Sequence, residues 1–79
     1  MTNIKVYSLP TCPKCNILKK KMQSIGLEFI NVDNEQEVLD FLKVNALPSE
    51  VPVLHIEGFP PMNFNQAWGW VSLQEENNG

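Results

Sequence analysis

T-C-P-K-C at residues 11–15 holds the only two cysteines of the 79-residue chain, between a short apolar run and a segment with helical spacing. Residues three apart in a helix have Cβ atoms roughly 5–6 Å apart. A disulfide needs Cα atoms about 4.4–6.8 Å apart. A helix that begins at this stretch could therefore close and reopen a disulfide between Cys12 and Cys15 with little movement of its backbone.

The start of such a helix also favours the anionic form of Cys12. The first turn of a helix has free N–H groups and a partial positive charge, and both stabilise a thiolate, which is the nucleophile in thiol–disulfide exchange. Pro13 suits the first helical position because its missing N–H would be unpaired there, and Lys14 adds positive charge. We expect Cys12 to be the exposed attacking thiol, with a pKa below that of a free cysteine. Cys15 shares a helix face with Leu18, so we expect it to be the shielded resolving thiol.

Other uses of a C-x-x-C pair fit this chain less well. A zinc site normally takes four Cys or His ligands, whereas the chain has two cysteines and one histidine. A structural disulfide that closes so small a ring would constrain the unfolded chain little. His55, the only histidine, lies within an apolar stretch, where a structural role outweighs that of a catalytic base. These observations favour a redox pair and no metal site.

Size and charge restrict the remaining classes of protein. The length and a hydrophobic content of 43% indicate one small domain, residues 1–74, with a polar tail at 75–79. A formal net charge of −3 argues against nucleic acid as a partner. The chain does not start like a signal peptide, and no segment is apolar enough to span a membrane. We expect a cytoplasmic monomer that binds neither nucleic acid nor membrane.

Strand and helix patterns alternate along the chain. β-Branched and aromatic residues predict strands at 4–8, 27–32 and 51–56, and helical spacing predicts helices at 13–25, 34–44 and 64–74. A short edge strand at 59–62 is limited by its two prolines. The order β-α-β-α-β-(β)-α predicts an α/β fold with a mixed sheet flanked by helices.

Single residues mark the ends of these helices. Thr11 or Cys12 can cap the first helix, and Gly26 is typical of its end. Asn34 and Glu37 have the spacing of a capping box at the second helix.

Lysines and tryptophans are further candidate binding residues. Residues 19–21 are all lysine, but they spread around more than half of the helix, so we expect a solvated face rather than an anion site. Trp68 follows the apolar spacing of the last helix and is expected in the core. Trp70 is expected on the outer side, where it is a candidate contact residue.

The chain resembles the glutaredoxin family of the thioredoxin superfamily over nearly its whole length. The resemblance is carried by I-K-V-Y-S at 4–8, T-C-P-K-C at 11–15 and V-P-V-L at 51–54. It implies a thioredoxin-like fold in its minimal form. It also implies a dithiol–disulfide oxidoreductase that reduces protein or glutathione mixed disulfides, with Cys12 as nucleophile and Cys15 as resolving thiol.

The resemblance implies further substrate-binding residues. Pro52 would be cis and pack beside the active-site disulfide. The backbone of Val51 would pair with an extended substrate, as in strand addition. Thr11, Pro13 and Lys14 would border the same substrate.

Three glutathione contacts of the family are replaced in this chain. Glutathione-dependent members usually carry Tyr or Phe where this chain has Lys14, and often carry lysine where it has Leu9. Their Gly-Gly-x-Asp stretch, which opens the last helix, is replaced by F-P-P-M-N-F at 59–64. We expect no bound cofactor, with glutathione as a possible reductant or co-substrate.

Three other functions fit parts of the sequence. Small redoxins that supply ribonucleotide reductase lack the same glutathione grip and take electrons from thioredoxin reductase, but their W-S-G-F-R-P tail is absent here. The stretch 62–71 looks more like small bacterial and phage glutaredoxin-like proteins. A [2Fe–2S] cluster-binding module is disfavoured by Pro13, and an adaptor without turnover is disfavoured by the intact cysteine pair.

Overall fold

Strands and helices alternate along residues 3–78, which are the residues that the computed structural model describes. The elements are β1 (Ile4–Tyr7), α1 (Pro13–Ser24), β2 (Ile30–Val32), α2 (Glu35–Val44), β3 (Val53–Ile56) and α3 (Phe64–Asn78). The sheet order is β2-β1-β3, with β2 parallel and β3 antiparallel to β1. The predicted α/β class with a mixed sheet is confirmed.

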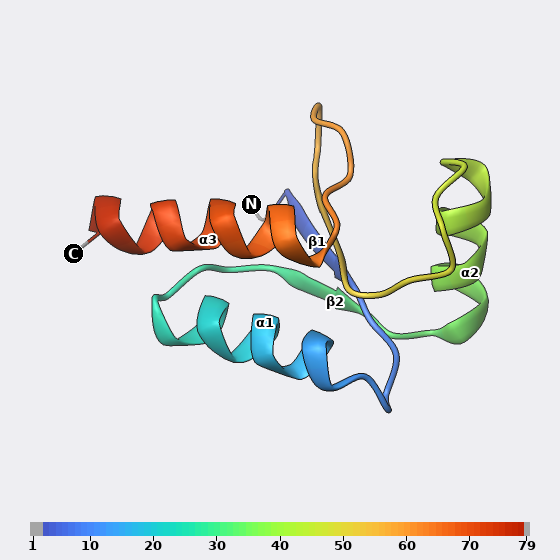
Figure 1. The fold of residues 1–79 in the computed structure, drawn as a ribbon, viewed down its shortest axis with the longest axis horizontal. Helices are drawn as coiled ribbons and strands as arrows, with labels where there is room; N and C mark the ends of the chain where they lie inside the picture. The colour runs from blue at the N-terminus through green and yellow to red at the C-terminus, as the bar shows by residue number, and fades with distance from the viewer. Residues whose placement is uncertain (1–2, 79) are drawn as a thin grey trace.

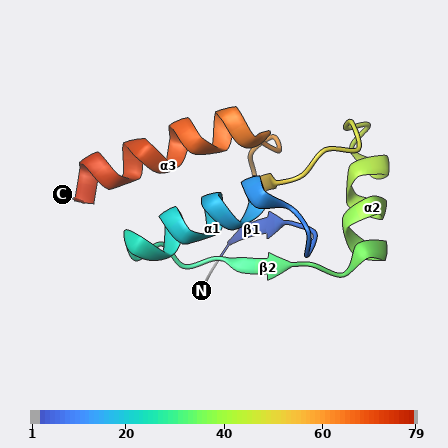
Figure 2. The same cartoon turned by 60° about the horizontal axis from the view of Figure 1, so that its bottom comes forward.

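Successive residues of the central strand point to opposite faces of the sheet, and each face has its own core. Val6 packs on one face with side chains of α1, β3 and α3, in the Val6 cluster: Val6, Leu18, Met22, Leu54, Ala67 and Val71. Tyr7 packs on the other face with α2 and β3, in the Tyr7 cluster: Tyr7, Val38, Leu42 and Val53. Figures 1 and 2 show the same division, with α1 and α3 near one another and α2 set apart from them.

The end of α1 explains why β2 is shorter than expected. Gly26 adopts a φ of +77°, its amide donates to the Gln23 carbonyl at 3.1 Å, and the Leu27 amide donates to the Met22 carbonyl at 2.9 Å. This pair of bonds is the Schellman motif that closes many helices. Because Leu27 is used in closing the helix, only Ile30–Val32 pair with β1, and the predicted strand at 27–32 is wrong in its first half.

The other strands also differ from the prediction at their ends. β1 ends at Tyr7 rather than residue 8, although the Ser8 amide still donates to the Val32 carbonyl at 2.9 Å. β3 begins at Val53 rather than residue 51. The short edge strand predicted at 59–62 is reduced to one bridge between Leu54 and Met62.

Helix α3 continues past the expected end at residue 74, so the predicted polar tail is helical as far as Asn78. Lys21 on α1 contributes to this extension, because its Nζ lies 2.9 Å from a Glu75 carboxylate oxygen and 4.6 Å from the centre of the Trp68 ring. Trp68 and Trp70 are both half-buried against the Val6 cluster. Gly79 lies outside the described residues. No helix within residues 3–78 is long and apolar enough to cross a bilayer.

Ala46 ends α2 with the unusual φ of 53°. The Ala46 amide donates to the Lys43 carbonyl at 3.1 Å and the Leu47 amide to the Leu42 carbonyl at 2.8 Å, so Ala46 takes the place that Gly26 takes after α1. A left-handed conformation costs a residue with a Cβ about 1–2 kcal/mol, and glycine avoids that cost.

Ala46→Gly is therefore expected to stabilise the protein. Part of the gain is offset by the greater freedom of glycine in the unfolded chain, so we expect a net gain of about 0.5–1 kcal/mol in the free energy of unfolding. Urea unfolding followed by circular dichroism measures it. Asn45→Gly is the contrasting variant: at a φ of −93° glycine relieves no strain, and the substitution removes the hydrogen bond from Asn45 Nδ2 to the Phe41 carbonyl, so it should destabilise the protein. A lower midpoint for Ala46→Gly than for wild type would contradict the argument.

Candidate functional site

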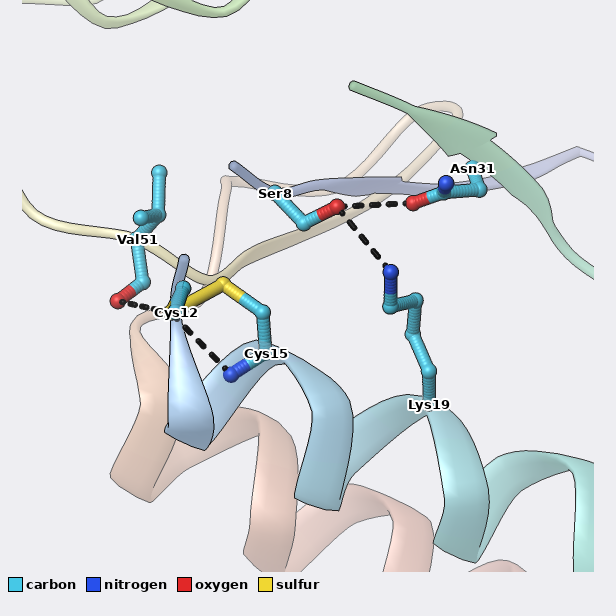
Figure 3. Close-up of a disulfide and its surroundings, with 6 residues drawn as sticks. All are labelled: Ser8, Cys12, Cys15, Lys19, Asn31 and Val51. Atoms are coloured by element: carbon cyan, nitrogen blue, oxygen red, sulfur yellow. Dashed lines mark hydrogen bonds between the residues drawn. A yellow bond between two sulfur atoms is a disulfide. The ribbon is translucent and has the colours of Figure 1, made fainter. Parts of the chain in front are cut away.

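The amino end of α1 carries both cysteines, which form a disulfide with Cα atoms 5.2 Å apart (Figure 3). Cys12 is the N-cap, with extended φ and ψ angles, and Pro13 follows in the first turn. Of the two capping residues that the sequence allowed, the structure selects Cys12, because the Cys15 amide donates to Cys12 Sγ at 3.1 Å. This bond directs one of the free amides of the first turn at the sulfur, where it would stabilise a thiolate.

The two cysteines differ in exposure. Cys15 is fully buried, at 0% exposed, whereas Cys12 is partly exposed. Cys12 Sγ also lies 3.6 Å from the carbonyl oxygen of Val51, to which a reduced thiol can donate. The Val51–Pro52 bond is cis and Pro52 is buried, as the resemblance implied. The loop before β3 therefore reaches the cysteine that a partner molecule can approach.

Three further predicted site residues border the disulfide at the surface. Thr11 and Pro13 are exposed on either side of Cys12. Lys14 is also exposed, and its Nζ lies 5.6 Å from the centre of the Phe64 ring on α3, within the range of a cation–π contact. The charged end of Lys14 therefore points from the surface beside the disulfide toward the start of α3.

Two positions that the family uses for glutathione are occupied differently here. Leu9 is half-buried and packs against the Tyr7 cluster, so this position offers no charge. At the start of α3, the Gln66 amide donates to Asn63 Oδ1 at 2.8 Å and the Asn63 amide donates to Gln66 Oε1 at 3.0 Å. This reciprocal capping box uses two amides at a helix end that could otherwise bind an anion.

A polar network that the sequence did not reveal lies on the Cys15 side of the disulfide (Figure 3). Lys19 Nζ donates to Ser8 Oγ at 3.4 Å, and Ser8 Oγ donates to Asn31 Oδ1 at 2.8 Å. The expectation that residues 19–21 form a solvated face is wrong for Lys19 and Lys21, which reach Ser8 and Glu75, and holds for exposed Lys20. The feature of the sequence that points to this network is the spacing of Cys15 and Lys19, which share one helix face at i and i+4.

His55 lies on β3 and is half-buried, with its ring 5.3 Å from that of Phe41, which stacks on Tyr7 at 3.8 Å. Burial raises the pKa of the Tyr7 hydroxyl, and the charge of Glu37 raises it further. This aromatic group belongs to the face covered by α2, which fits the structural role expected for His55. Within residues 3–78, no three His, Cys, Asp or Glu side chains gather as metal ligands.

The fold and the cysteine geometry define a redox protein of the thioredoxin fold. The solved structure of a mutant of a thioredoxin-like protein superimposes with a TM-score of 0.71 at 22% identity, over 89% of this chain and 96% of that one. A glutaredoxin-like protein of 8.6 kDa from the rubredoxin operon of Clostridium pasteurianum, itself uncharacterised, is 33% identical over 66 residues, which are 81% of this chain and 88% of the relative. The glutaredoxin family model matches residues 4–59. The chain belongs to the glutaredoxin family.

Proposed function

We propose that the protein is a dithiol–disulfide oxidoreductase that reduces protein or glutathione mixed disulfides. The Cys12 thiolate attacks a substrate disulfide, joins one substrate sulfur in a mixed disulfide and releases the other as a thiolate. Cys15 then attacks Cys12 Sγ, which forms the Cys12–Cys15 disulfide and releases the second substrate thiolate. Two electrons pass to the substrate, and an outside reductant restores the dithiol.

The observation that carries this proposal is the asymmetry of the pair. Only Cys12 is open to a partner, it receives an amide hydrogen bond at 3.1 Å, and the cis Val51–Pro52 segment lies beside it with the Val51 carbonyl 3.6 Å away. An extended substrate backbone could add along Val51 with its disulfide directed at Cys12. Thr11, Pro13 and Lys14 would border such a substrate.

A second candidate function is electron donation to ribonucleotide reductase, with thioredoxin reductase as the source of electrons. It is favoured by the positions that the family uses for glutathione: Leu9 packs into the fold, and Asn63 and Gln66 use the free amides at the start of α3. A protein reductant needs neither of these contacts.

The two candidates differ in what reduces the Cys12–Cys15 disulfide. We would supply NADPH with glutathione and glutathione reductase in one assay, and with thioredoxin reductase in the other, and follow NADPH consumption with a small disulfide substrate. Because Leu9 and the capping box leave little to grip glutathione, we expect the faster turnover with thioredoxin reductase. Turnover with glutathione alone would favour a glutathione-dependent glutaredoxin, and turnover with neither would contradict the proposed function.

The remaining expectations belong to the same proposal. A pair that cycles between dithiol and disulfide suits a reducing compartment, so we propose that the protein is cytoplasmic. We also propose that it is a monomer and that it acts on protein disulfides without a resident cofactor. A [2Fe–2S] role would show as iron and visible absorption in protein purified without oxygen, and an adaptor role as cellular activity that survives loss of Cys12.

A further inference from the structure

The resolving step of the proposed reaction requires a charge at a buried sulfur. Cys15 must lose its proton before it can attack the mixed disulfide, because the thiolate is the nucleophile. Cys15 is 0% exposed. Burial in apolar surroundings disfavours a thiolate, and the first-turn amide that could assist is directed at Cys12 instead. The step therefore calls for another group near Cys15 that favours negative charge.

The lysine one turn further along α1 is placed to do this. Figure 3 shows that the side chains of Cys15 and Lys19 point to the same side of the helix, and that Ser8 lies on that side. Lys19 is half-buried and its Nζ lies 3.4 Å from Ser8 Oγ, rather than extending into solvent as exposed Lys20 does. Because Cys15 and Lys19 are four residues apart in the helix, the Lys19 side chain lies on the same helix face as the Cys15 side chain.

The direction of the hydrogen bonds at the Ser8 hydroxyl holds the Lys19 ammonium in this position. Ser8 is fully buried, its amide donates to Val32 of the neighbouring strand at 2.9 Å, and its hydroxyl donates to Asn31 at 2.8 Å. With its hydrogen given to Asn31, the Ser8 oxygen presents lone pairs to Lys19. The network thus orients a positive charge without supplying an acidic partner that would neutralise it.

Other ionisable side chains within residues 3–78 do not take this place. His55 is half-buried beside Phe41 on the α2 side. The remaining charged side chains near α1 lie on α1 itself, on the strands and α3 that pack against it, and on the neighbouring loops. They are exposed or paired elsewhere: Lys5, Lys14, Lys20, Lys21, Glu28, Asp33, Glu50, Glu75 and Glu76. Among the lysines of α1, Lys19 is the one whose ammonium reaches the buried Ser8 hydroxyl, on the side of the helix that carries Cys15.

We propose that Lys19, held by Ser8 and Asn31, is a positioning residue that favours the Cys15 thiolate and so speeds the release of substrate from the mixed disulfide. The proposal rests on the proposed function and names the group that assists its second step. In that step the Cys15 proton passes to solvent, the Cys15–Cys12 bond forms, and the bond from Cys12 to the substrate sulfur breaks with its electron pair leaving on the substrate.

The test separates the two steps of one turnover. The reduced protein is mixed with dithiobis(nitrobenzoate), whose coloured thiolate is released once when Cys12 attacks and again when Cys15 resolves. Stopped-flow absorbance gives both rates as a function of pH. Cys15→Ser, which should show the first phase alone, assigns the second phase.

For Lys19→Met we expect a second phase about tenfold slower near neutral pH, the change in thiolate population that one pKa unit produces. Its pH profile should move to higher pH while the first phase is unchanged, and Lys19→Arg should restore the rate. Lys20→Met is the matched control, because it removes the same charge from the adjacent exposed position. A merely structural role for Lys19 would lower the thermal midpoint without moving the pH profile.

Two results would contradict different claims. Equal second-phase rates and pH profiles in Lys19→Met and Lys20→Met would overturn the role of Lys19. A wild-type protein that releases only one equivalent of the coloured thiolate would overturn the proposed dithiol reaction itself.

Discussion

Cys12→Ser is expected to abolish disulfide reduction, with turnover falling by more than about a thousandfold, as when a nucleophile is removed from other covalent catalysts. A serine hydroxyl does not ionise near neutral pH and forms no bond to a substrate sulfur. Cys15 cannot replace it, because Cys15 is 0% exposed. The assay is NADPH-coupled turnover with whichever reductant serves the wild type. Serine is a good N-cap, so α1 should begin as before, which circular dichroism can check.

The matched variant is Cys15→Ser, which removes the other sulfur of the pair. It should keep the first attack and accumulate a mixed disulfide that mass spectrometry locates at Cys12. Substantial turnover by Cys12→Ser, or a mixed disulfide at Cys15 in wild-type protein, would reverse the roles assigned to the two cysteines.

Leu18→Ala should have the largest effect on stability. Leu18 is 0% exposed in the Val6 cluster, and it lies one turn beyond Cys15 on the face of α1 that packs against the sheet. Truncation of a buried leucine to alanine costs about 2–5 kcal/mol in the free energy of unfolding. In a domain of this size each kcal/mol corresponds to about 4–8 °C in the thermal midpoint, so we expect a fall of about 10 °C or more.

Ile17→Ala is the control for this prediction, since Ile17 is the adjacent residue of α1 and is 50% exposed. Calorimetry or thermal circular dichroism on the oxidised proteins compares the two variants under one redox state. A midpoint for Leu18→Ala within a few degrees of that for Ile17→Ala would show that this part of the core repacks around the loss.

Local signals predicted α1 well because its two ends are defined by neighbouring residues. Cys12 and Pro13 begin the helix and Gly26 closes it, and each acts through its own backbone geometry. The cis bond at Pro52 followed from the resemblance rather than from local pattern, because the sequence around a proline does not fix its isomer.

The network behind the disulfide could not be predicted, because it depends on pairing between distant segments. Val6 pairs with Asn31 and Tyr7 with Val32 in the parallel register of β1 and β2, and this register brings Asn31 near Ser8. The length of α3 has the same cause, since Glu75 meets Lys21 only when the two helices pack together. Residues 75–78 are polar, and their spacing alone gave no reason to extend the helix.

The single bridge at Met62 has a consequence for how the protein behaves at high concentration. A strand with unpaired backbone groups at the border of a sheet is a template on which other chains can assemble. On the β3 side that border is covered where Met62 pairs with Leu54, next to two prolines that have no N–H to donate. On the other side β2 is three residues long. This sheet therefore offers little continuous backbone for aggregation, although it has only three strands.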